Sequence, residues 1–129
     1  MNISQAAEKT GLSTKQIRDY EKAGLLPLPN RTQSGYRFYN EVDLDRLFFI
    51  GNARKVGFSL VQIAELLKLN DNPNRTSREV KQLTEQHIAE LEQKINDLNE
   101  MLKLLKSWSR ICCGNNSPEC SILNGLRDH

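Results

Sequence analysis

Three cysteines near the end of the chain, Cys112, Cys113 and Cys120, are the residues best suited to chemistry. Cys112 and Cys120 enclose seven residues, a spacing at which two thiolates can hold one soft metal ion. Two sulfur ligands suit an ion of low coordination number, above all Cu(I), with Ag(I) and Au(I) as mimics. Zinc prefers about four ligands, and a [2Fe–2S] cluster needs about four cysteines. The alternative is that these are incidental reduced thiols.

The residues around this loop favour a reactive thiol at its far end. Gly114 can turn the chain, and Ser117 followed by Pro118 is typical of a helix N-cap and the first helical residue. We therefore predict that Cys120 lies in the first turn of a short last helix. The unpaired N–H groups and the dipole of a helix start stabilise a thiolate, so we expect a lowered pKa for Cys120.

A long helix is predicted to carry this loop. Thr76 and Glu79 form a capping box, and the helical pattern then continues to about Ile111. Roughly 34 residues correspond to a rod of about 50 Å. Apolar residues recur along it at intervals of three and four: Ile88, Leu91, Ile95, Leu98, Leu102 and Leu105. We call this heptad pattern the apolar seam.

The apolar seam predicts a homodimer through a coiled coil, and the positions of Ser77 and the cysteine loop point to an antiparallel one. A single rod cannot bury the seam on itself, and the alternative, packing on the helices before it, is disfavoured because those helices are too short. Ser77 and Cys112 lie at opposite ends of the rod, about 50 Å apart. Only an antiparallel partner would bring Ser77 and Lys81 beside the cysteine loop of the other chain.

The first seventy residues have the outline of a winged helix-turn-helix, a fold that docks on duplex DNA. Ser4 can cap a first helix, and Ser13 with Gln16 forms a capping box for a second one. Residues 34–35, Ser-Gly, are a turn signal between two short extended runs that would form the wing. Two further helices should begin after the caps Asn40 and Ser59.

Basic and aromatic side chains in this part are the candidate DNA contacts. Lys15 and Arg18 would lie on the second helix in or beside the major groove, with Tyr20 at its edge. The candidates in the wing are Arg31, Tyr36 and Arg37. Any one of these alone is more often a solvated surface residue, but two capped helices followed by a Gly-Tyr-Arg wing form a specific signal.

The charge of the chain is unevenly spread. Residues 1–60 hold nine Lys/Arg and six Asp/Glu, a net charge of +3, whereas residues 61–129 hold nine and ten, a net charge of −1. The basic excess therefore coincides with the DNA motif, as phosphate binding requires. No apolar run approaches the length of a membrane span, and the first twenty residues do not resemble a signal peptide, so we expect a cytoplasmic protein.

At these residues the chain resembles the MerR family of transcription regulators. The matching motifs are Ile-Arg-Asp-Tyr-Glu at 17–21, Gly-Leu at 24–25, Arg31, Gly-Tyr-Arg-Phe-Tyr at 35–39, Ala-Arg-Lys at 53–55 and Gly-Phe-Ser-Leu at 57–60. The resemblance implies that five residues contact the DNA backbone: Arg18, Tyr20, Tyr36, Arg37 and Arg54. Asp19 departs from the family, which usually has an aromatic or other neutral residue there. This departure bears on the preferred operator.

The dimer helix and the cysteine loop look like those of the copper-efflux branch of this family, which implies Cys112 and Cys120 as the metal ligands. In the family, the position matching Ser77 tends to be cysteine in sensors of divalent ions and serine in sensors of monovalent ions. Ser77 and Lys81 would accordingly lie over the metal. Cys113 departs from the branch, which usually has a non-thiol residue there, and we expect it to be a spare thiol.

The sequence thus predicts a mainly α-helical protein in three parts. These are a winged helix-turn-helix DNA-binding domain (1–70), a dimerisation helix (76–111), and a metal-binding loop with a short terminal helix (112–129). The resemblance implies a Cu(I)-responsive activator that binds a palindromic promoter of copper-efflux genes with an overlong spacer. It would bend and untwist this promoter until RNA polymerase can use it.

Three other functions remain as alternatives. The first is a sensor of another thiophilic ion, such as Ag(I), Au(I), Zn(II), Hg(II) or Pb(II), and the second is a copper buffer or chaperone that needs no DNA contacts. The third is a thiol oxidoreductase, but the chain has no Cys-x-x-Cys motif. No nucleophile–base pair, Gly-rich phosphate loop or zinc-protease motif appears either, so we predict no enzyme.

Overall fold

The computed structural model describes residues 1–129 apart from 28–29, 32–34, 36, 113, 117 and 129. The chain divides into two compact units, Met1–Val80 and Lys81–His129. The described residues form α1 (Ile3–Thr10), α2 (Thr14–Lys22), β1 (Asn30–Arg31), β2 (Arg37–Phe38), α3 (Glu41–Lys55), α4 (Leu60–Asp71), α5 (Ser77–Ile111) and α6 (Ser121–Arg127). The predicted mainly α-helical fold is therefore confirmed.

Capping boxes start the four helices of the first unit that bear the DNA motif. Ser13 with Gln16 caps α2, and Asn40 and Ser59 cap α3 and α4, as predicted. The prediction for α1 is wrong, because its N-cap is Asn2 and not Ser4. The Asn2 side chain accepts a hydrogen bond from the Gln5 backbone at 2.8 Å, so a complete capping box lies two residues earlier.

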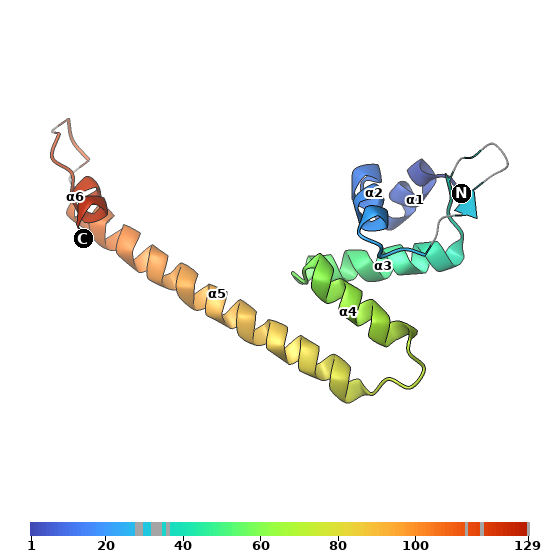
Figure 1. Ribbon diagram of the computed structural model, residues 1–129. Coiled ribbons are helices and arrows are strands. Elements are labelled where there is room, and N and C mark those ends of the chain that lie inside the picture. The colour runs from blue at the N-terminus through green and yellow to red at the C-terminus, as the bar shows by residue number, and fades with distance from the viewer. Residues whose placement is uncertain (28–29, 32–34, 36, 113, 117, 129) are drawn as a thin grey trace. The chain divides into compact units, whose positions relative to one another are not determined.

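The core of the first unit is small and continuous. Its fully buried large side chains come from α2, α3 and α4: Ile17, Leu47, Ile50 and Ile63. Figure 1 shows α1 and α2 as neighbours on one side of α3. This packing fixes the orientation of α2, whose polar face is consequently turned outward.

The wing is a two-stranded antiparallel ribbon. Asn30 pairs with Phe38 and Arg31 with Arg37. Gly35 adopts a φ of 85°, a backbone conformation that glycine reaches without steric cost, as the predicted turn requires. The base of the ribbon is tied to the start of the chain, because the Tyr39 N–H donates to the Met1 carbonyl at 2.7 Å.

The second unit consists of most of α5 together with α6. Helix α5 is 35 residues long, close to the predicted limits. All six residues of the apolar seam are exposed, from 36% at Leu91 to 57% at Leu98. Among the described residues of this unit only His87 is buried. None of the described helices is both long and apolar enough to cross a membrane.

Helix α6 begins later than predicted. Its first residue is Ser121, and Cys120 is the N-cap, with extended backbone angles (φ −149°, ψ 121°). Pro118 lies outside the helix, in the part of the loop that remains irregular. Of the predicted cap pair, Ser117 lies outside the described residues. Cys120 therefore precedes the first turn of α6, and the predicted position within that turn is wrong.

Candidate functional sites

Helix α2 presents a row of cations. Lys15, Arg18 and Lys22 follow one another at intervals of three and four residues, so they share one face, and all three are exposed. Ile17 and Tyr20 lie on the opposite face and are buried in the core. Because Ile17 and Tyr20 fix one face of α2 in the core, the opposite face with the three cations is held toward solvent.

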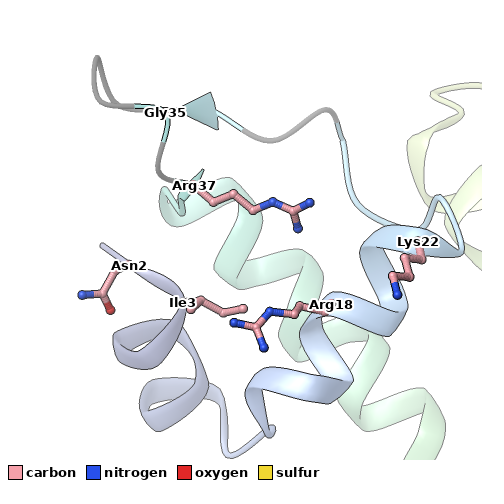
Figure 2. A pocket seen from close by; sticks show the side chains of 6 residues that line it. All are labelled: Asn2, Ile3, Arg18, Lys22, Gly35 and Arg37. Carbon is pink, nitrogen blue, oxygen red and sulfur yellow. The ribbon is translucent and has the colours of Figure 1, made fainter.

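Two of these cations meet the wing at a pocket of about 560 Å³. Its lining residues are Asn2, Ile3, Arg18, Lys22, Gly35 and Arg37. In Figure 2 the side chains of Arg18 and Arg37 extend from α2 and β2 into the space between these elements and α1. Three cationic side chains around one concave surface suit a phosphate group. We call this site the basic pocket.

Glu21 holds the wing against α2. Its buried carboxylate forms an ion pair with Arg37 and accepts a hydrogen bond from the Tyr39 hydroxyl. Burial raises the pKa of Tyr39, which keeps this hydroxyl protonated as a donor. A guanidinium has five N–H donors, so Arg37 can bind Glu21 and still offer donors to a phosphate. Glu21 thus orients Arg37.

The other side of α2 borders a second pocket, of about 650 Å³. Gln16, Tyr20, Arg54 and Lys55 are among its lining residues. Arg54 donates a hydrogen bond to the Phe58 carbonyl at 3.2 Å, which fixes its guanidinium near the end of α3. Tyr20 is only 4% exposed, so its main role is in the core, and only its edge at this pocket is accessible.

These positions bring the described DNA candidates to both sides of one helix. Arg18 and Arg37 line the basic pocket, and Tyr20 and Arg54 line the second pocket. Lys15 lies exposed on α2 between them. A helix flanked in this way can enter the major groove while its flanks bind the two phosphate backbones. Arg31 lies in β1, its side chain outside the described part, and Tyr36 is not among the described residues.

The second unit brings two thiols together. The sulfur atoms of Cys112 and Cys120 lie 3.5 Å apart, although eight positions separate the residues in the chain. Metal–sulfur bonds are about 2.3 Å long, so one ion can reach both sulfurs. In the described part of the chain no cluster of three or more His, Cys, Asp or Glu residues is placed to hold a metal. Cys113 and His129 lie outside that part.

The pKa of the Cys120 thiol is lowered. The main cause is a hydrogen bond from the backbone N–H of Leu123, followed by the neighbouring Cys112 thiol; the Ile122 N–H acts in the same direction. These amides belong to the first turn of α6, so the predicted effect of a helix start on this thiol is present. Cys120 receives it from the N-cap position.

The two remaining site candidates lie at the other end of α5. Ser77 is the first residue of this helix, and Lys81 is one turn further on. The Lys81 ammonium lies 3.9 Å from the Glu85 carboxylate, and both side chains are largely exposed. The 35 residues of α5 separate Ser77 from the thiol pair, so within one chain Ser77 and Lys81 do not lie beside Cys112 and Cys120.

Comparison with known proteins decides the family. A family model described as MerR HTH family regulatory protein matches residues 1–70, and one described as MerR, DNA binding matches residues 44–108. The chain belongs to the MerR family. A probable heavy metal-dependent transcriptional regulator of Haemophilus influenzae is 61% identical to this MerR regulator over 126 residues, 98% of each chain.

Two further relatives of this MerR regulator carry metal-related names. The HTH-type transcriptional regulator CueR of Yersinia pestis is 45% identical over 126 residues, 98% of this chain and 91% of CueR. The transcription regulator PbrR691 from Ralstonia metallidurans CH34, whose crystal structure was solved in complex with lead(II), shares 37% sequence identity with this chain. Its TM-score is 0.86, with 98% of both chains covered. The protein is thus a metal-responsive, DNA-binding regulator and not an enzyme.

Lys22, which lines the basic pocket, and the neighbouring Glu21 were not predicted as site residues from the sequence of this MerR regulator. Lys22 was signalled by its spacing from Arg18, since residues four apart share a helix face. Glu21 gave no such signal, because its partners Arg37 and Tyr39 come from the wing and only the fold brings them to α2.

Proposed function

We propose that this MerR-family protein is a Cu(I)-responsive transcription activator, with Cys112 and Cys120 as the metal ligands. The observation that carries the proposal is the thiol pair, with sulfur atoms 3.5 Å apart and a lowered pKa at Cys120. Two soft sulfur ligands favour an ion that accepts low coordination, which describes Cu(I), Ag(I) and Au(I) better than Zn(II). These thiols fit such an ion, and when bound it would tie the two ends of the loop together.

Ser77 supports a monovalent ion. In the MerR family its position tends to be cysteine in sensors of divalent ions, and the present chain has no thiol there. The alternative is a divalent thiophilic ion, because PbrR691 is described in complex with lead(II). Zn(II) would require ligands beyond Cys112 and Cys120, which the described residues do not supply.

The active form in this proposal is an antiparallel homodimer. The exposed apolar seam of α5 needs a partner, and a second copy of the same helix offers a matching seam. Antiparallel pairing would set Ser77 and Lys81 of one chain beside the thiol pair of the other. The Lys81 ammonium would then compensate part of the negative charge of a metal-bound dithiolate.

On DNA, the dimer would bind a palindromic promoter with an overlong spacer and distort it for RNA polymerase. Smooth bending of a site of this kind costs on the order of 1–6 kcal/mol. To move the regulator from about 1% to 99% in the DNA-distorting conformer, the metal must bind that conformer about 10⁴-fold more tightly. This requirement equals roughly 5.5 kcal/mol, which is of the size of the bending cost.

An anaerobic competition titration against a Cu(I) chelator tests the metal assignment. We expect tight binding of one Cu(I) per subunit in the wild type and in Cys113→Ser, and a loss of at least about 100-fold in Cys120→Ser, because one of the two proposed ligands is removed. Zn(II) should bind far more weakly. Preference for Zn(II), or Cu(I) binding that is indifferent to Cys120→Ser, would contradict the proposal and leave the DNA-binding part unaffected.

A further inference from the structure

Helix α6 lies against the end of α5 through an unusually close contact. A β-carbon added to Gly125 would lie 2.3 Å from both Cε2 and Nε1 of the Trp108 indole. The backbone of α6 therefore rests directly on this ring, and Figure 1 shows α6 beside the last turns of α5. Glycine inside a helix costs about 1 kcal/mol relative to alanine, so this contact explains a residue that helix propensity disfavours.

The carbonyl of Trp108 makes a second connection between the two helices. It accepts the backbone N–H of Cys112 at 3.3 Å and the hydroxyl of Ser121 at 2.5 Å. Cys112 is the first residue of the loop, and Ser121 directly follows Cys120 at its end. One carbonyl thus binds both ends of the segment that carries the thiol pair.

We infer that Trp108 is a positioning residue for the thiol pair: its indole seats Gly125 and its carbonyl tethers Ser121, which together hold the Cys120 sulfur opposite the Cys112 sulfur. The inference rests on the proposed metal function and deepens it. We call these contacts the tryptophan clasp. In this inference Trp108 and Gly125 are not metal ligands and act through the placement of α6.

The physical reason is preorganisation. Cys112 directly follows α5, whereas Cys120 lies eight residues further along the chain, and without a contact at α6 the position of its sulfur relative to that of Cys112 would be free to vary. Fixing this freedom before the ion arrives removes an ordering cost from binding. Because van der Waals contact between carbon atoms requires about 3.5 Å, a methyl group on Gly125 would push α6 away by roughly 1 Å.

A double-mutant cycle in the full-length protein tests the clasp through Cu(I) affinity. We expect Gly125→Ala to weaken Cu(I) binding by about 10-fold in chelator competition. The same substitution in a Trp108→Leu background should have almost no effect, because the ring that it collides with is absent. Asn124→Ala is the matched control, since it places an added helix former at an exposed neighbouring position of α6. Ser121→Thr should retain binding better than Ser121→Ala.

A metal-free measurement separates the clasp from the copper assignment. Trp108 is the single tryptophan of the chain, so its fluorescence reports whether α6 is seated. In Gly125→Ala we expect red-shifted emission and faster quenching by acrylamide. In a Cys113→Ser background, diamide joins the two remaining thiols in a disulfide and takes up their two protons and two electrons. This reaction should be about 10-fold slower in Gly125→Ala.

The outcomes distinguish the two claims. If the wild type binds no Cu(I) while Gly125→Ala exposes the indole and slows the cross-link, the clasp is supported and the copper assignment fails. If the wild type binds Cu(I) and Gly125→Ala matches it in affinity, fluorescence and cross-linking rate, the clasp is wrong. An equal loss of affinity in Gly125→Ala with and without Trp108→Leu would also overturn it.

Discussion

The two units of this MerR regulator differ in where their apolar side chains lie. In the first unit, Ile17, Leu47, Ile50 and Ile63 have no exposed surface. In the second, the seam of α5 is exposed throughout, and of its described residues only His87 is buried. The first unit therefore has a core of its own, whereas the second carries an apolar surface that calls for a partner.

This difference assigns the two units different roles in the proposed switch. The DNA-binding unit orients its cations through internal contacts, such as the Glu21 carboxylate that holds Arg37. The thiol pair lies at the end of a helix whose burial would come from the partner chain. A ligand that alters the loop can thus act on the dimer interface, while the DNA-binding unit keeps its internal structure.

The largest effect is expected from a charge in the seam. Leu98→Glu places two carboxylates at the centre of the proposed dimer, and a cost of roughly 2 kcal/mol for each raises the dissociation constant about 1,000-fold. Sedimentation at micromolar concentration should show a monomer. Gln93→Glu is the control, because it adds the same charge on the polar face of α5. A dimer that survives Leu98→Glu unchanged would rule out the seam as the interface.

The comparison also explains which features the sequence could predict. Capping boxes such as Ser13 with Gln16 depend on residues three apart, so they were found correctly. The prediction at α1 was wrong because Asn2 with Gln5 completes a capping box, whereas the residue three positions after Ser4 is Ala7, which cannot complete one. The limits of α5 followed from an uninterrupted heptad pattern. The predicted start of α6 was wrong, because a Ser-Pro pair is compatible with the first residues of a helix but does not require a helix to begin there.

Contacts across the fold could not be predicted. Tyr39 and Glu21 are 18 residues apart in the chain, and Ser121 and Trp108 are 13 apart. No local spacing signals such pairs, since the packing of whole helices brings them together. The sequence alone gives no reason for a glycine at position 125, and only the position of the Trp108 ring supplies one.

A substitution in the basic pocket should have a smaller effect, and it should change DNA binding without changing metal binding. Arg18→Ala removes a cation from the basic pocket, so we expect promoter affinity to fall about 10-fold and the salt dependence to decrease by about one phosphate contact. Cu(I) affinity should not change, because the thiol pair belongs to the other unit. Lys9→Ala, an exposed cation of α1 that does not line this pocket, is the control for fluorescence anisotropy with promoter DNA. Equal losses in both variants would mean that general charge, and not the basic pocket, governs binding.

The smallest effect concerns a surface contact within the first unit. Arg46 donates a hydrogen bond to the Leu25 carbonyl at 2.9 Å and two hydrogen bonds of 2.9 Å to the Asp71 carboxylate. The hydrogen bonds from Arg46 lower the pKa of Asp71. A carboxylate with a lowered pKa stabilises the fold above its unfolded-state pKa, and this contribution disappears as the pH falls through the folded-state value.

Because the Asp71 side chain is 49% exposed, solvent screening keeps its contribution below about 1 kcal/mol. Asp71→Asn should therefore lower the free energy of unfolding in urea slightly at pH 7, and the difference from the wild type should vanish in acid. Glu65→Gln, at an exposed carboxyl of the same helix, is the control. A larger loss, or one that persists in acid, would contradict this small, charge-dependent role of Asp71 in the first unit.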